Sequence, residues 1–169
     1  VMEALNAAGG LPTCNWQRGT FEEASEIAGA AFAQSGDVLR HKACMLCPIT
    51  CSKVSRARNG AFPGSLTEGP EYENQYSFGS NLGNRDRSAI IECERLCDEL
   101  GLDGISTGVA IGFAVELYQR GAISEREVGF PLSFGDVRAF QKLVQMIANQ
   151  EGFGKVLSQG VNKAAEIIG

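Results

Sequence analysis

Residues 86–108 read DRSAIIECERLCDELGLDGISTG, and this stretch decides the fold class. Its apolar positions recur with the period of an α-helix and share one stripe: Ile90, Cys93, Cys97 and Leu100. Gly101 follows as a stop signal, because glycine readily adopts the left-handed conformation that ends helices. The stretch therefore predicts a helix over 86–100 and a second helix that starts near Ser106 and ends before Gly121.

Helix-starting signals recur on both sides of this stretch. Thr20 with Glu23 has the spacing of a capping box, and the small residues that follow predict a helix ending near Gly36. Ser124 with Glu127 has the same spacing and predicts a further helix start.

The rest of the chain also favours helices over strands. Asp136 is placed to cap an apolar segment with helical spacing that Gly152 closes, and a last helix is predicted over 155–168. No window alternates as a strand does, and the turn-forming residues between Cys51 and Glu68 predict a loop. We therefore predict an all-α fold, a single irregular multi-helix domain over residues 1–169.

Composition limits the classes of function. The chain has 169 residues, 44% of them hydrophobic, which is enough for one domain with a core. The net charge of −5 offers no basic stripe, so we expect no nucleic-acid partner. No apolar run approaches the length of a spanning helix and no signal peptide is recognisable, so we expect a cytoplasmic protein with no membrane partner. Because Val1 is not a start residue, we expect the chain to be a fragment of a larger protein.

Three of the six cysteines, Cys44, Cys47 and Cys51, fall within eight residues, which is not the pattern of a disulfide framework. That spacing lets one loop wrap three corners of a [4Fe–4S] cluster, which usually takes four thiolates. The fourth would come from Cys14, from Cys93 or Cys97, or from a segment outside this chain. Cysteines on the apolar stripe of a helix are poor candidates, because there they behave as small buried hydrophobes.

Zinc and simple burial are the alternatives for the three-cysteine loop. A zinc site normally draws on a second paired-ligand motif, yet the chain has no second Cys-x-x-Cys and only one histidine, His41. Buried, inert thiols are rarely crowded so closely. The spacing therefore favours iron–sulfur over zinc.

Acidic residues form two further motifs. Asp98 and Glu99 fall in the last turn of the predicted helix, where its dipole disfavours negative charge by roughly 0.3–1 kcal/mol each. A ligand rich in N–H donors, or a basic neighbouring residue, would offset this unfavourable interaction with the helix dipole. Taken alone, these residues are better explained structurally, with Asp98 and Glu99 as solvated surface acids, Asp103 as a helix cap and Glu73 as a first-turn glutamate.

Taken together and in order, these motifs resemble the tungsten-dependent aldehyde ferredoxin oxidoreductase family over nearly the whole chain. The matching stretches are residues 10–16, 44–51, 68–73, 79–83, 96–108, 116–118 and 151–154. The most specific are Glu-Gly-Pro-Glu-Tyr-Glu at 68–73 and Leu-Cys-Asp-x-x-Gly-Leu-Asp-x-Ile-Ser-Thr-Gly at 96–108. The resemblance is to the middle domain of these enzymes, which is mainly helical.

The resemblance implies a cofactor set and roles for particular residues. Cys44, Cys47 and Cys51 would ligate a [4Fe–4S] cluster beside one pterin of a tungsten (or molybdenum) bis-pterin. The pterin would be bound by Asp98, Leu102 and Asp103, the two carboxylates accepting from ring N–H groups. Glu73 would be the catalytic carboxylate that transfers a proton or orients the substrate. Aldehydes would be oxidised to carboxylic acids, with ferredoxin as the electron acceptor.

Departures from the family pattern shape the remaining expectations. The second Asp-x-x-Gly-Leu-Cys motif, the N-terminal pterin-binding β domain and the C-terminal helical domain are absent from this sequence. We therefore expect the isolated chain to lack its cofactors and activity and to need the remaining domains of the parent enzyme.

Two alternatives to aldehyde oxidation stay open. The catalytic subunit of ATP-independent benzoyl-coenzyme A reductases resembles the same family and reduces an aromatic ring. A stand-alone iron–sulfur electron carrier would have to supply its own fourth ligand, for which Cys14 is the candidate.

Overall fold

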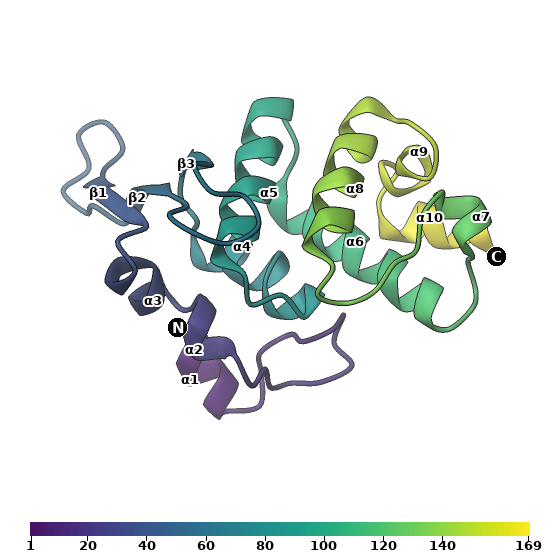
Figure 1. The fold of residues 1–169 in the computed structure, drawn as a ribbon, viewed down its shortest axis with the longest axis horizontal. Helices are drawn as coiled ribbons and strands as arrows, with labels where there is room; N and C mark the ends of the chain where they lie inside the picture. The colour runs from purple at the N-terminus through teal and green to yellow at the C-terminus, as the bar shows by residue number, and fades with distance from the viewer.

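The computed structural model describes residues 1–169. Most of the chain forms helices, and a small sheet lies at one edge (Figure 1). Six of the ten α-helices have six residues or fewer. The helices are α1 (Met2–Ala7), α2 (Ala24–Ile27), α3 (Gly29–Gln34), α4 (Tyr72–Ser77), α5 (Arg87–Leu100), α6 (Gly104–Gln119), α7 (Glu125–Val128), α8 (Val137–Asn149), α9 (Gly154–Leu157) and α10 (Val161–Ile168), with a 3₁₀ helix η1 (Ser80–Leu82).

The three strands β1 (Val38–Lys42), β2 (Ser52–Arg56) and β3 (Leu66–Glu68) form an antiparallel sheet in the order β1-β2-β3. The prediction of an all-α fold and of a loop over 51–68 was therefore wrong in this region. All three strands are short and only β2 carries partly buried positions along most of its length. An apolar alternation needs one buried face, so strands this exposed leave no such pattern in the sequence.

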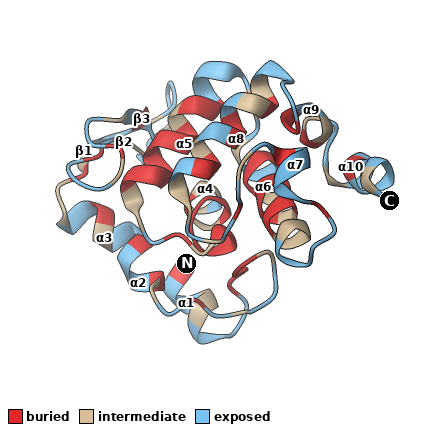
Figure 2. Cartoon of the chain, turned by 45° about the vertical axis from the view of Figure 1, so that its right-hand side comes forward, coloured by how far each residue is buried: buried red, intermediate tan, exposed pale blue.

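The core lies where α5, α6 and α8 meet, and each of these helices turns a row of buried residues towards the other two (Figure 2). Several of the largest side chains there are fully enclosed: Phe78, Ile90, Ile91, Ile111, Phe140 and Leu143. Cys93 and Cys97 are buried on α5 as the sequence predicts, whereas Leu100 is 42% exposed. Burial of this apolar surface holds the helices together.

Helix boundaries follow from capping groups. The Asp86 side chain accepts from the Ser88 amide at the start of α5, and Gly101 ends that helix in the left-handed conformation with φ 70°. The predicted capping box of Ser124 and Glu127 is confirmed at α7, and the Asp136 cap is confirmed at α8.

Two predicted helices are broken. The segment that was expected to run to Gly36 divides at Ala28, whose ψ of 156° is extended, and Glu23 rather than Thr20 stands at its N-cap. The last helix divides between α9 and α10, because Gly160 takes a φ of 82°. A helix requires negative φ and ψ at every residue, so one such position ends it.

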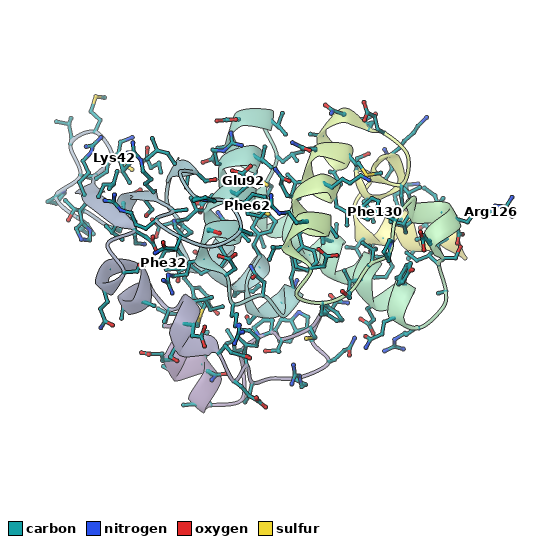
Figure 3. The ribbon with its side chains drawn as sticks, viewed as in Figure 1. Phe32, Lys42, Phe62, Glu92, Arg126 and Phe130 are labelled. Carbon is teal, nitrogen blue, oxygen red and sulfur yellow. The ribbon has the colours of Figure 1, made fainter.

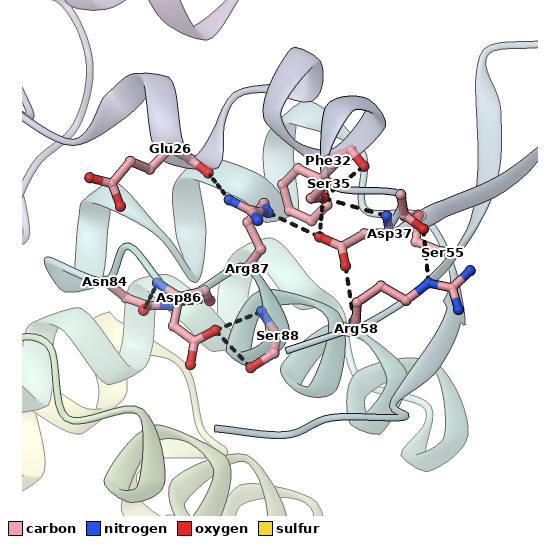
Figure 4. Close-up of polar contacts among 12 residues, drawn as sticks. Glu26, Phe32, Ser35, Asp37, Ser55, Arg58, Asn84, Asp86, Arg87 and Ser88 are labelled. Atoms are coloured by element: carbon pink, nitrogen blue, oxygen red, sulfur yellow. Dashed lines mark hydrogen bonds and ion pairs between the residues drawn. The ribbon is translucent and has the colours of Figure 1, made fainter. Parts of the chain in front are cut away.

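Polar contacts attach the start of the sheet to α5 and, through Arg87, to α2 (Figure 4). Asp37, directly before β1, accepts hydrogen bonds from the Arg87 guanidinium at 3.0 Å and from the Arg58 amide at 3.0 Å. Arg87 also donates to the carbonyl of Glu26 in α2. The sheet end of the molecule, where Lys42 lies, is far from Arg126 on α7 (Figure 3).

No single helix is long and apolar enough to cross a membrane. Helices α5 and α6 reach that length and composition only together, and the pair is bent by 118°.

Candidate functional site

Residues 68–73 link β3 to α4 and are held against β2 by main-chain and side-chain bonds. The Gly69 amide donates to the Lys53 carbonyl at 2.6 Å, and the Ser55 hydroxyl donates to the Gly69 carbonyl. The Pro70 carbonyl accepts from the Lys53 ammonium at 3.0 Å. Gly69 has a φ of 144°, which is accessible to glycine but strained for other residues. The segment is thus fixed in place, and Glu73 projects to the surface from the first turn of α4.

The second predicted segment surrounds the bend between α5 and α6. Asp98 is exposed and accepts a hydrogen bond from the Thr67 hydroxyl of β3 at 3.1 Å. Leu102 is half-buried, and its amide donates to the Cys97 carbonyl at 2.8 Å. Asp103 accepts from the Ser106 amide at 2.7 Å, so it caps α6, which begins at Gly104 and not near Ser106. Hydrogen bonds from the side chain and the amide of Ser106 lower the pKa of Asp103.

The fold brings these two segments together. Helix α4 packs on α6, and α5 packs on β3. Burial raises the pKa of Tyr76 in α4, and the charges of Glu73 and Asp103 act in the same direction. The Ser77 hydroxyl lies 3.5 Å from the Gly104 carbonyl, at the start of α6. Glu73, Asp98, Leu102 and Asp103 therefore lie around one region where α4, β3 and the α5–α6 bend meet.

One residue in this region was missed by the sequence reasoning. Glu94 of α5 is 4% exposed, and its Oε1 accepts from the Asn74 amide at 3.0 Å. Burial raises the pKa of Glu94 to about 8, and the charges of Asp98 and Glu71 act in the same direction. The available signal was the spacing of Glu94 and Asp98, because like charges four apart on one helix face repel each other.

The three predicted metal ligands, Cys44, Cys47 and Cys51, lie on the loop that joins β1 to β2, at the end of the molecule remote from α7 and α10 (Figure 1). Cys44 and Cys51 are exposed and Cys47 is half-buried. The Cys47 amide donates to the Cys44 carbonyl at 3.0 Å, and Leu46 between them has a φ of 63°. The loop turns sharply, which puts its first two cysteines on one turn.

The cysteines of this loop and the residues around it decide whether an iron–sulfur cluster can bind here. Three thiols on one short loop match the thiolate ligation of iron–sulfur clusters. The structure holds no group of three or more His, Cys, Asp or Glu side chains arranged to bind a metal ion. The other three cysteines are buried. Cys93 and Cys97 lie in the core, whereas the Cys14 sulfur packs beside Gly83 and accepts a hydrogen bond from Arg18. The three thiols are therefore suitable ligands for an iron–sulfur cluster. The structure shows no fourth cysteine ligand beside the loop.

Comparisons with known proteins match the whole chain to one family. The model of the family described as aldehyde ferredoxin oxidoreductase, domains 2 and 3, covers residues 1–169. The chain belongs to this aldehyde ferredoxin oxidoreductase family. A tungsten-containing aldehyde ferredoxin oxidoreductase of Pyrococcus furiosus is 39% identical over 100% of the chain and 27% of the relative. The resemblance inferred from the motifs is thus confirmed.

Two further proteins similar to the chain carry names of other reactions. The WOR-like subunit of an aliphatic sulfonate oxidoreductase from P. furiosus is 42% identical over 91% of the chain and 24% of the relative. The active-site complex BamBC of benzoyl coenzyme A reductase, solved with 1,5-dienoyl-CoA, superposes with a TM-score of 0.65 at 25% identity over 80% of the chain and 20% of that chain. The chain spans about a quarter of the length of the curated relatives it matches.

Proposed function

We propose that this chain is the middle part of a tungsten-pterin, iron–sulfur oxidoreductase that oxidises aldehydes to carboxylic acids and passes the electrons to ferredoxin in the cytoplasm. The observation that carries the proposal is the family match over residues 1–169, with relatives named as tungsten-containing aldehyde ferredoxin oxidoreductases. Because the relatives are about four times longer, the activity belongs to the whole protein and requires its other domains.

Each predicted residue has a role that its surroundings support. Cys44, Cys47 and Cys51 would hold three corners of a [4Fe–4S] cluster, which supplies one-electron transfer when bound. Their loop is exposed, and Met45, Leu46 and Ile49 on it are 92%, 96% and 67% exposed, so it has apolar surface for a neighbouring domain to cover.

The predicted pterin-binding residues lie at the bend between α5 and α6, where Asp98 accepts a hydrogen bond from Thr67 of β3. Asp98, Leu102 and Asp103 would bind the pterin, with the carboxylates accepting from N–H donors. Glu73 is solvent-exposed beside Tyr76 and would hold or transfer a proton as the aldehyde is oxidised. An exposed carboxyl group in the first turn of α4 is accessible to a substrate that a neighbouring domain presents.

The catalytic role is tested in the full-length protein. Glu73→Gln is expected to lower kcat for aldehyde oxidation by about 10²–10⁴-fold, the usual loss of a general acid or base. Glu125→Gln is the matched control, because Glu125 is also an exposed first-turn glutamate, on α7. Equal activity of the Glu73→Gln and parent proteins would refute the assigned role.

Substrate tests separate the candidate reactions. The benzoyl coenzyme A reductase neighbour favours ring reduction as a second candidate, and the sulfonate oxidoreductase relative favours sulfonates. Turnover of an aldehyde with ferredoxin, and none with an aliphatic sulfonate or dienoyl-CoA, supports the proposal. Turnover confined to either of the other two substrates refutes it.

Cluster binding is tested by anaerobic reconstitution with iron and sulfide, iron counting and electron paramagnetic resonance. Cys47→Ser in the full-length protein should lose the four-iron signal, whereas Cys93→Ser, a change in a buried core thiol, should keep it. If Cys14→Ser alone removed the cluster from the isolated chain, the electron-carrier alternative would be favoured instead.

A further inference from the structure

Two glutamates of α5 are almost equally buried yet differ in their partners. Glu92 is 5% exposed, and its carboxylate accepts from Arg95, from Ser65 at 2.7 Å and from Gln141 at 3.2 Å. Glu94 is 4% exposed and receives one hydrogen bond, from Asn74, while its Oε2 has no partner. A buried carboxylate with so few donors is costly, and protonation removes that cost.

The groups that face Glu94 make its negative charge still less favourable. On its own helix it faces Asp98 and the thiol of Cys97, and from the segment before α4 it faces Glu71. Lys53 of β2 opposes this effect on Glu94, but its ammonium also lies 4.0 Å from the Glu71 carboxylate. The buried Oε1 of Glu71 also lacks a donor. This region therefore has more acceptors than donors, and a proton on a carboxyl supplies a donor.

Glu94 also lies between the two segments that carry the predicted catalytic and pterin-binding residues. A Cβ atom at Gly69 would overlap the Glu94 carboxyl group, so this carboxyl packs directly on the main chain of residues 68–73. The Asn74 amide that donates to Glu94 has its oxygen against Gly104, the residue after Asp103. One buried carboxyl and one amide thus connect the Gly69 turn, the start of α4 and the start of α6.

We propose that Glu94 is a positioning residue that carries a proton at neutral pH and, as a neutral carboxylic acid, holds residues 68–73 against residues 98–103. The inference rests on the proposed function only in taking these two segments as parts of the active site. Loss of the proton adds a third negative charge beside Asp98 and Glu71, and repulsion then loosens the contact at Gly69. The raised pKa of Glu94, about 8, is consistent with this arrangement.

The test is a pH titration of the full chain by nuclear magnetic resonance. The ¹³C signal of the Glu94 carboxyl is expected to titrate with a midpoint near 8, and the amide signals of Gly69 and Gly104 should shift with the same midpoint. Glu94→Gln keeps the shape of the neutral acid, so both amide titrations should disappear. Glu92→Gln is the matched control on the same helix and should leave both titrations unchanged.

Several results would overturn the proposal. A carboxyl midpoint at the ordinary value for glutamate shows that Glu94 is ionised at neutral pH. Amide titrations that persist in Glu94→Gln show that another group causes them. Since none of these signals depends on a bound cofactor, failure here is distinct from failure of the aldehyde or cluster assays. In the full-length enzyme, an alkaline limb near pH 8 in kcat/KM that Glu94→Gln removes supports the positioning role, and an unchanged limb counts against it.

Discussion

Replacing Glu94 by glutamine is expected to stabilise the chain by an amount that grows with pH. Burial raises the pKa of this carboxyl from 4.5 to about 8. Below the lower value both the folded and the unfolded protein are protonated, and between the two values only the folded protein keeps the proton. The free energy of unfolding therefore falls as pH rises through this window. At 1.36 kcal/mol per unit, the cost reaches about 3 kcal/mol at pH 7 and about 5 kcal/mol above pH 9.

Urea denaturation followed by circular dichroism at pH 5, 7 and 9 measures this effect. The free energy of unfolding of Glu94→Gln should exceed that of the parent chain slightly at pH 5 and increasingly at pH 7 and 9. A difference that stays constant across the three values would refute the reasoning, because a pH-independent gain cannot come from ionisation.

Glu92 provides the opposite case on the same helix. Burial acts to raise its pKa, but hydrogen bonds from Arg95 and Ser65 outweigh burial and lower it. Its stabilising contribution is present above the unfolded pKa and is lost as pH falls through the folded pKa. Glu92→Gln should therefore cost stability at pH 7 and cost less in acid.

Three further predictions concern the turn, the cap and the core. Gly69→Ala should destabilise the chain by about 1–3 kcal/mol, since its φ of 144° is strained for alanine and a Cβ would overlap Glu94; an unchanged urea midpoint contradicts this. Asp103→Ala should cost about 1 kcal/mol through loss of the bond from the Ser106 amide, measured by thermal denaturation, whereas Asp103→Asn should retain most of it. Leu143→Ala should cost about 2–5 kcal/mol in urea because the side chain is fully buried, and a loss below about 1 kcal/mol would argue against a packed site.

The long helices were predictable because their own residues encode them. Helix α5 carries an apolar stripe, an aspartate cap and a terminal glycine, and α8 has the same combination of stripe and cap. The strands were not predictable, since β1 is mostly exposed and the sheet depends on pairing with β2 rather than on an apolar face. The helix breaks at Ala28 and Gly160 are seen only in the backbone angles of the structure.

The candidate site was predictable only in part. The spacing of Cys44, Cys47 and Cys51 marks a loop in the sequence, and the structure places all three between two strands. The approach of Glu73 to Asp103 depends on how α4 packs on α6, which no local pattern contains. Glu94 escaped notice because glutamate is common on helices, and only the packing of Gly69 and Asn74 shows that it is enclosed.

The bend between α5 and α6 has an electrostatic consequence for the acids around it. The carbonyl end of α5 and the amide end of α6 carry the equivalent of about half a unit charge each, of opposite sign. Only residues 101–103 separate them, so the two poles lie close together and their fields largely cancel. Asp98 therefore does not face an isolated negative pole, and Arg95 pairs with the neighbouring Glu99. Residues inserted into this turn would move the poles apart and restore the repulsion that a last-turn aspartate otherwise meets.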